Sequence, residues 1–361
     1  MQRPARRETA TRKPHCLSHT DSAAAAAKDA RAWAKTLAEY NTPSGTRAIL
    51  ELAVTFLPFA ALWAIMAFAL VNGYWLALIL AVPAAAFLVR LFMIQHDCGH
   101  GAFFGNSRAN DWTGRVIGVL TLTPYSLWKR IHALHHAGSG CLDHRGFGEI
   151  ATLTVAEYRA LSAWQRFKYR LYRHPLVLFG VGPAFLFIVD QRLPAGKMRE
   201  GWQPWVSTMG TNLAIAAVVS VLVWLVGWKV FLAIQLPVTL LAATAGVWLF
   251  FVQHQFEETT WERLPAWKRQ EAALYGSSHY DLPEPLRWLT ANIGVHHVHH
   301  LSARIPFYRL ARVLRDHPEL RDINRMTLLD SLKTIPLALW DETRHRMISF
   351  GEYRRIEAAT A

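Results

Sequence analysis

The sequence predicts an all-α integral membrane protein with four transmembrane helices in two hairpins and a cytoplasmic helical cap that holds a histidine-rich metal site. Apolar residues make up 52% of the 361 residues although the formal charge is +13, so the two kinds of residue must be segregated. Four apolar stretches are long enough to cross a bilayer, which takes about 20 helical residues. Three histidine clusters lie just outside these stretches.

The four candidate spans are consecutive pairs with very short turns. They are Leu52–Val71, Tyr74–Ile94, Trp205–Trp228 and Val230–Val252. The turn at Asn72 and Gly73 carries no Lys or Arg, and the second turn carries only Lys229, whereas residues 1–47 hold nine. By the positive-inside rule, both termini and the long middle segment are expected to face the cytoplasm. The membrane that the chain crosses is expected to be the inner (plasma) membrane.

The chain divides into three parts around these spans. Residues 1–47 have the charge of a signal peptide but lack its apolar core and cleavage site, so they are expected to form a basic, solvated cytoplasmic arm. This arm is expected to be disordered to about Ser22. Residues 48–310 are predicted to form the membrane domain, and residues 311–361 a cytoplasmic helical tail.

The middle segment contains two shorter apolar stretches, Gly114–Trp128 and Leu176–Val189. Each is too short to span the membrane comfortably and contains Gly or Pro. If only one crossed, the second and third histidine clusters would lie on opposite faces of the membrane. We therefore predict that both lie in the interface or dip into it and return.

A Thr-x-x-Glu capping box at Thr154 and Glu157 predicts a helix that ends near Pro175. Aromatic and basic residues alternate along it, which is typical of an interfacial amphipathic helix. A soluble helix packed on the cytoplasmic cap is the alternative. The alternating residues are Tyr158, Trp164, Phe167 and Tyr172 with Arg159, Arg166, Lys168 and Arg170.

The histidine clusters are the most informative feature of the sequence. They are His96 and His100, then His132, His135 and His136, then His296, His299 and His300. Helical side chains at i, i+3 and i+4 share a face, so each cluster is expected to direct its imidazoles to one point. With 17 His in the chain, His-x-x-His-His is expected about 0.04 times by chance, yet it occurs twice, which disfavours a chance gathering in solvated loops.

His254 is a ninth candidate ligand because it follows the fourth span at once. A continuous second helix would carry His96 and His100 just beyond the hydrocarbon, at a similar depth. A lone interfacial histidine is the alternative reading of His254. Nearby polar residues are candidate hydrogen-bond partners for the imidazoles, which metal-bound histidines commonly need. They are Asp97, Gln253, Gln255, Glu257 and Glu258.

Eight or nine histidines are too many for one ordinary zinc site, so two metals are implied. Imidazole alone does not choose among zinc, copper, nickel and iron. A metal transporter is disfavoured because the four spans contain no Asp, Glu or His, and Arg90 is their one charged residue. Nucleic acid is not an expected partner, because no nucleic-acid motif accompanies the basic residues, which flank the spans and meet anionic membrane lipid.

The cysteines are expected to be small packing residues and not ligands. They are Cys16, Cys98 and Cys141, all on the side assigned to the reducing cytoplasm.

The motifs resemble the histidine boxes of membrane fatty acid desaturases. They read His96-Asp-Cys-Gly-His100, His132-Ala-Leu-His-His136 and Gly294-Val-His-His-Val-His-His-Leu301, with Gln253-His254 after the last span. The resemblance extends from the first hairpin to about Leu310. It implies a cytoplasmic non-haem di-iron centre, with two iron ions, that uses dioxygen and two externally supplied electrons to introduce a double bond into an acyl chain.

The resemblance transfers the role of metal ligand to nine residues, and implies no catalytic or cofactor-binding residue beyond them. They are His96, His100, His132, His135, His136, His254, His296, His299 and His300. His297 breaks the helical pattern and is expected to point elsewhere. The first box is shorter than in the acyl-CoA branch, and Phe250 stands where that branch has a ligand asparagine. These departures favour the acyl-lipid branch, most similar to bacterial omega-6 desaturases.

An acyl lipid is therefore the expected substrate. A separate electron donor is also expected, in bacteria a ferredoxin, because the chain shows no haem-domain motif. A basic surface could steer such an acidic donor or contact lipid headgroups. It includes Arg304, Arg309, Arg312 and Arg315. A di-iron hydroxylase or ketolase acting on a lipid, alkane or carotenoid is the alternative function.

Overall fold

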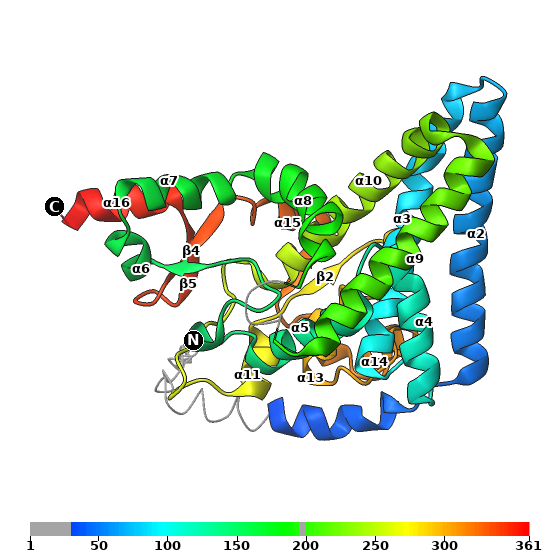
Figure 1. Cartoon of the computed structure of the whole chain (residues 1–361). Helices are drawn as coiled ribbons and strands as arrows, with labels where there is room; N and C mark the ends of the chain where they lie inside the picture. Colours follow the sequence, from blue (N-terminus) through cyan, green and yellow to red (C-terminus); the bar gives the residue numbers. More distant parts are fainter. Residues whose placement is uncertain (1–29, 195–199, 361) are drawn as a thin grey trace, which may run out of the picture.

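The computed structural model describes residues 30–194 and 200–360. The expected disorder to about Ser22, the rest of the arm to residue 29, and Cys16 lie outside the described residues. The described chain is mostly helical, which confirms the predicted class. Four long helices stand together at one end, and most of the shorter elements extend to one side of them (Figure 1).

The four predicted spans are all present as long apolar helices. They are α2 (Gly45–Val71), α3 (Ala81–His100) preceded by the 3₁₀ segment η2 (Trp75–Leu80), α9 (Trp202–Val226) and α10 (Trp228–His254). As predicted, α3 continues without a break through the first histidine cluster, and α10 ends on a histidine.

Glycines with positive φ make both turns between paired helices. Gly73 has φ 84° between α2 and η2, and Gly227 has φ 80° between α9 and α10. The left-handed region is readily open to glycine because it has no Cβ. The prediction that Lys229 lies in the second turn is wrong: the chain turns at Gly227, so Lys229 already belongs to α10.

The lateral surface of the long helices is apolar and exposed. The most apolar 18-residue window of α9 contains no buried residue. Leu213 is 74% exposed and Trp224 is 83% exposed. A continuous exposed apolar surface of this length matches the hydrocarbon of a bilayer, so this is a membrane protein.

One buried ion pair joins the first two long helices. Arg90 of α3 pairs with Glu51 of α2, and both side chains are almost fully buried. The Arg90 guanidinium also donates to Thr55 Oγ1 at 3.1 Å and lies 4.0 Å from the ring centroid of Trp288 in α12 (Glu284–Leu289). These contacts connect α2, α3 and α12 through one charged side chain.

The apolar stretch Gly114–Trp128 is not one element. It is divided between α4 (Ser107–Leu120) and α5 (Tyr125–Gly138) by a short turn in which Leu122 has φ 55°. Helix α4 packs on α3 and α5, and α5 carries the second histidine cluster.

Gly114 lets α4 and α5 approach closely, so Gly114→Ala is expected to lower the free energy of unfolding by about 1–3 kcal/mol. An added Cβ would lie 2.2 Å from Cε2 of Tyr125, whose hydroxyl donates to the Cys98 carbonyl at 2.9 Å. Thermal unfolding in detergent measures the change. Gly210→Ala in α9 is the control, because its Cβ would meet nothing within 4 Å. Equal midpoints for the two variants would contradict the predicted clash.

The capping box at Thr154 and Glu157 is present, but the helix that it opens, α6 (Val155–Ala160), has only 6 residues. A second capping box at Ser162 opens α7 (Ala163–Tyr172). The prediction of one continuous helix is therefore wrong. The chain bends between the two boxes because each Ncap residue is extended.

The reading of a helix packed on the cap holds for α6, and the interfacial reading of α7 stays a prediction. Tyr158 of α6 is fully buried against the C-terminal part of the chain, whereas Trp164 and Phe167 of α7 are exposed. The apolar stretch after α7 forms a π-helical turn, Val177–Val181, and α8 (Gly182–Ile188). The helical segment Val177–Arg192 is bent by 57° relative to α7. Together, this segment and α7 are apolar enough for a broken span or a re-entrant loop.

Two small sheets were not predicted. In the first, β1 (Leu153–Thr154) pairs in parallel with β4 (Leu337–Asp341), which pairs antiparallel with β5 (Arg346–Ser349). In the second, β2 (His279–Asp281) pairs in parallel with β3 (Arg325–Thr327). The C-terminal segment is thus not the helical tail predicted, because its strands join it to the middle of the chain.

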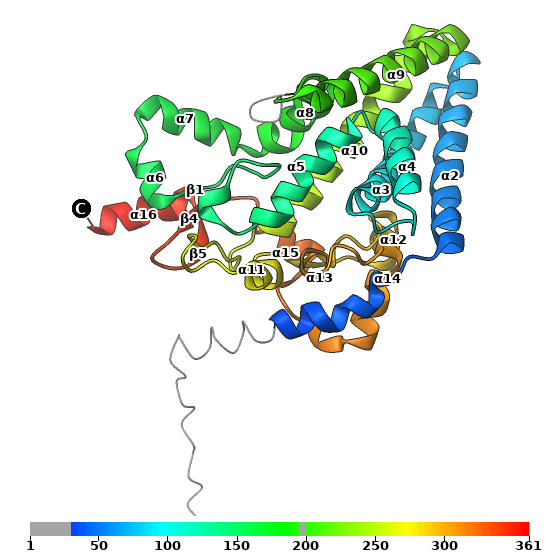
Figure 2. The same ribbon diagram turned by 60° about the horizontal axis from the view of Figure 1, so that its bottom comes forward.

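The remaining elements are short. They are η1 (Leu37–Asn41), η3 (Leu142–His144), η5 (Asp190–Arg192), α11 (Arg269–Tyr275), α13 (His296–Leu301), α14 (Phe307–Asp316), η7 (Pro318–Arg321), α15 (Leu328–Leu332) and α16 (Phe350–Thr360). The described end of the N-terminal arm runs beside α14 (Figure 2). There Leu37 is buried and the Tyr40 hydroxyl donates to Asp316 at 2.9 Å, so this part is not a solvated arm.

Candidate metal centre

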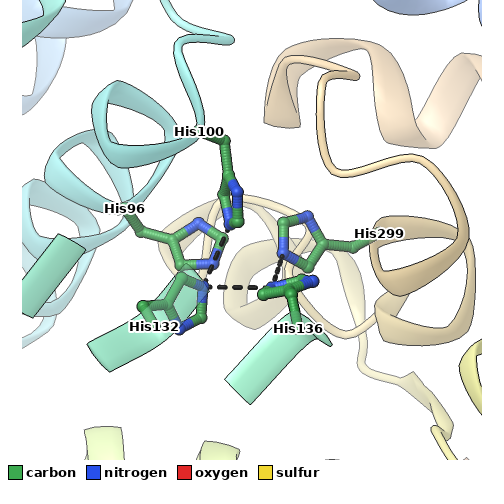
Figure 3. Close-up of side chains that lie close together, drawn as sticks. All are labelled: His96, His100, His132, His136 and His299. Atoms are coloured by element: carbon green, nitrogen blue, oxygen red, sulfur yellow. Dashed lines mark hydrogen bonds between the residues drawn. The ribbon is translucent and has the colours of Figure 1, made fainter. Parts of the chain in front are cut away.

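The structure gathers all nine predicted ligands into two groups. The five-histidine group is His96, His100, His132, His136 and His299 (Figure 3), and the four-histidine group is His135, His254, His296 and His300. Within each group, one potential ligand nitrogen per residue lies within 4.8 Å of every other. The two groups are adjacent, since the stacked rings of His136 and His300 have centroids 4.1 Å apart.

Each three-histidine cluster contributes to both groups, so the prediction that each would aim at one point is wrong. In α5, His132 and His136 turn to the five-histidine group and His135 to the other. In α13, His296 and His300 share the four-histidine group and His299 joins the other. Residues at i and i+4 lie on nearly the same line of a helix, whereas i+3 and i+4 are about 100° apart and can serve two neighbouring points.

The imidazole nitrogens converge closely. In the five-histidine group, Nε2 of His132 lies 3.0 Å from Nε2 of His100 and 3.1 Å from Nε2 of His136, which lies 3.2 Å from Nε2 of His299 (Figure 3). In the four-histidine group, Nε2 of His254 lies 3.2 Å from Nε2 of His135 and 3.0 Å from that of His296.

Burial keeps these imidazoles neutral. It lowers the pKa of the α5 and α13 histidines well below the usual range, because the charged form loses its hydration. These residues are His132, His135, His136, His296, His299 and His300. Neutral imidazole presents an unprotonated nitrogen, which is the form that binds a metal.

The donor set fits a transition metal. Nε2 of His132 has two other Nε2 atoms within about 3 Å, and in a neutral ring this nitrogen is either one donor or one acceptor, so hydrogen bonding cannot satisfy both contacts. Two nitrogens bound to one ion at ~2.1 Å and at right angles lie about 3 Å apart. The observed separations therefore suit an ion at the centre of each group.

Only some of the expected hydrogen-bond partners contact the histidines. Asp97 does, with Oδ1 3.3 Å from Nδ1 of His96, while its Oδ2 accepts from the Phe307 backbone N–H at 2.6 Å. His254 instead approaches the backbone carbonyl of Gly276 at 3.3 Å through Nδ1. Asp97 thus connects the end of α3 to the start of α14.

The other polar neighbours of His254 point away. The Gln253 amide donates to the Ile293 carbonyl, the Gln255 carbonyl oxygen accepts from Arg173, and Glu257 pairs with Arg346. Consecutive side chains at the end of a helix point in different directions. Adjacency to His254 in the sequence therefore did not identify its hydrogen-bond partner.

Two expectations about excluded residues hold. The Nε2 atom of His297 lies 2.8 Å from the Leu320 carbonyl, and the residue belongs to neither histidine group. Cys98 and Cys141 are fully buried and free. Phe250, the residue that replaces asparagine, lies with its ring centroid 5.4 Å from that of His254.

Trp128 contacts the five-histidine group but was not among the predicted site residues. Its ring stacks on His132 with centroids 4.7 Å apart and planes at 12°. Gly99, inside the first histidine motif, permits this contact, since an added Cβ would lie 2.9 Å from the Trp128 ring. The i, i+4 spacing between Trp128 and His132 was the signal available in the sequence.

Comparison with known proteins decides the family. The family model described as "Fatty acid desaturase" matches residues 73–327. The chain belongs to the fatty acid desaturase family. It is 42% identical over 322 residues to the "Fatty acid desaturase" of Bacillus subtilis. The aligned region covers 89% of this chain and 91% of that relative.

More distant relatives include acyl-lipid enzymes. The "sn-1 acyl-lipid omega-3 desaturase (ferredoxin)" of Synechocystis is 28% identical over 235 residues, covering 62% of each chain. The "sn-1 oleoyl-lipid 12-desaturase" of Anabaena variabilis is 26% identical over 242 residues, covering 62% of this chain and 63% of the relative. None of these relatives is named as a hydroxylase or ketolase. This chain is thus a membrane fatty acid desaturase, an oxidoreductase of lipid metabolism that acts on a lipid and needs an electron donor.

Proposed function

We propose that the five-histidine and four-histidine groups each hold one iron ion, and that this di-iron centre introduces a double bond into the acyl chain of a membrane lipid. The observation that supports the proposal is the convergence of nine imidazoles from α3, α5, α10 and α13 on two adjacent points. Imidazole is a ligand that suits iron, and dioxygen-dependent chemistry requires a redox-active metal.

A metal is needed because an unactivated methylene has no acidic proton for a side chain to remove. When bound, the two ions would activate dioxygen, with two electrons from the donor, for the removal of two hydrogens. The chain itself holds the imidazoles in place, keeps them neutral and excludes bulk water by burying them. Because α3 and α10 end at His100 and His254, the centre would lie at one boundary of the hydrocarbon.

The proposed electron donor is a ferredoxin. It would bind the enzyme from the cytoplasmic side of the inner membrane, where the enzyme is proposed to lie. The excess of basic residues outside the span turns supports this orientation. The name of the Synechocystis relative includes ferredoxin. Exposed Arg304, Arg312 and Arg315 around α14 offer a basic surface to an acidic donor, or else to lipid headgroups.

Expression of the chain in a bacterial host whose lipids lack the relevant double bond tests the function. Mass spectrometry of the acyl chains is expected to show a new species lighter by two hydrogens, absent from cells with an empty vector. A product that retains an added oxygen would favour the hydroxylase or ketolase instead. Purified protein is expected to contain about two iron ions per chain.

A further inference from the structure

A small cavity lies beside the four-histidine group. Its walls include the rings of His135, His254 and Phe250, and it has room for a molecule of about the size of water. Its polar lining also includes the side chains of Glu149 and Trp261. Both belong to loops outside the histidine clusters.

Two buried N–H donors of cavity-lining residues have no acceptor among the described residues. One is Nδ1 of His135, which is buried and unpartnered. It carries the proton of the neutral ring when Nε2, the nitrogen that faces His254, binds a metal. The other is Nε1 of Trp261, whose side chain is only 4% exposed. A buried donor without an acceptor costs about 1–3 kcal/mol, so both need a partner.

Three side chains that line the cavity carry an acceptor oxygen: Ser139, Glu149 and Gln255. Oε1 of Gln255 already accepts from Thr152 and Arg173, and the Glu149 carboxylate is the strongest acceptor of the three. Oε1 of Glu149 accepts from the Gly146 backbone N–H at 2.6 Å. The nearest cation, Arg145, is bonded to Glu157. Burial raises the pKa of Glu149 to about 7. The half-buried Glu149 carboxyl therefore has capacity for a further hydrogen bond.

We propose that Glu149 is a positioning residue for the four-histidine group, acting through a water molecule in this cavity that accepts from Nδ1 of His135 and donates to the Glu149 carboxyl. Such a water has two lone pairs, which also accommodate the Trp261 N–H. A partner on the outer nitrogen fixes the tautomer and the orientation of a metal-bound imidazole. Asp97 makes the equivalent contact directly to His96 of the five-histidine group.

The inference rests on the proposed iron site, and its test separates the two. Full-length protein loaded with iron is mixed with an excess of a chromophoric iron chelator, and the release of each iron is followed over time. Loss of the Glu149 partner is expected to speed the release of one iron per chain by about 10–100-fold while leaving the other unchanged. Two rates are expected because the cavity adjoins only the four-histidine group.

Four variants make the experiment specific. Glu149→Leu removes the acceptor, whereas Glu149→Gln retains an acceptor oxygen and is expected to restore most of the slow release. Trp261→Phe removes one N–H, keeps the ring, and is expected to give a smaller acceleration of the same phase. Glu258→Gln is the matched control, since Glu258 is exposed and close to His254 in the sequence.

Equal release rates for Glu149→Leu and Glu258→Gln, or equal acceleration of both irons in Glu149→Leu and Trp261→Phe, would overturn the positioning role. If the native chain binds no iron under any loading condition, the proposed metal centre fails, and this inference fails with it. Two irons in the native chain together with an unchanged Glu149→Leu would refute only the inference.

Discussion

Replacing His299 or His135 by alanine is expected to reduce desaturation by more than about 100-fold. His299 supplies a nitrogen to the five-histidine group and His135 to the four-histidine group, so each variant opens one of the two sites. Loss of a ligand's hydrogen-bond partner already costs about 10–100-fold, and loss of the ligand itself must cost more. The readout is the unsaturated fraction of the acyl chains in the expressing host.

The control for these variants is His345→Asn. His345 is exposed, belongs to neither group and has φ 49°, a conformation that asparagine tolerates. All variants should be present in the membrane fraction in similar amounts. The reason is that buried imidazoles at a metal site stabilise the fold mainly through the metal that they bind. Near-normal product from both alanine variants would refute the assigned ligands. Treatment of the purified native enzyme with a strong chelator is expected to abolish turnover similarly.

The second large effect concerns the buried ion pair of the first hairpin. Glu51→Leu is expected to lower the free energy of unfolding by about 3–5 kcal/mol, because it leaves the Arg90 charge buried without its carboxylate. The contacts of Arg90 with Thr55 and Trp288 do not neutralise the charge. Unfolding of the purified protein in detergent, followed by heat or denaturant, measures the loss.

A double variant and an exposed neighbour test the cause. Glu51→Leu combined with Arg90→Met removes both charges and is expected to recover most of the lost stability, since well-packed apolar residues can replace a buried pair. Arg47 also contacts Glu51 but is half exposed, so Arg47→Gln should cost less than about 1 kcal/mol. A double variant as unstable as Glu51→Leu would show that packing, and not the unpaired charge, determines the loss.

The long helices could be predicted from the sequence because the relevant interaction is local. A helix that crosses a bilayer requires about 20 mostly apolar residues, and such stretches can be recognised from consecutive residues of the sequence. The bounds of α2, α9 and α10 differ from the predicted spans by only a few residues, apart from the extra turns at the start of α2. The second turn was misplaced by two residues because Gly227, and not the charge of Lys229, sets where the helix breaks.

The shorter elements were predicted less well because their boundaries depend on partners distant in the sequence. The capping box at Thr154 identified where α6 begins but not where it ends, because its end depends on Tyr158 packing under the C-terminal sheet. The strands of that sheet are two to five residues long, and their hydrogen-bond partners lie far away in the sequence: β1 pairs with β4, and Met347 of β5 donates to the Glu257 carbonyl. No local pattern distinguishes such strands from loops.

By itself, the sequence determined the membrane class and the four spans, because apolar length is a local property, and the resemblance of its histidine motifs named the nine histidines that converge. The tertiary structure decided how these histidines divide between two groups, since that depends on how α5 and α13 face α3 and α10. It also decided which polar residues approach the imidazoles. Glu149 and Trp261 reach the cavity beside His135 from distant loops, and only three-dimensional packing brings them there.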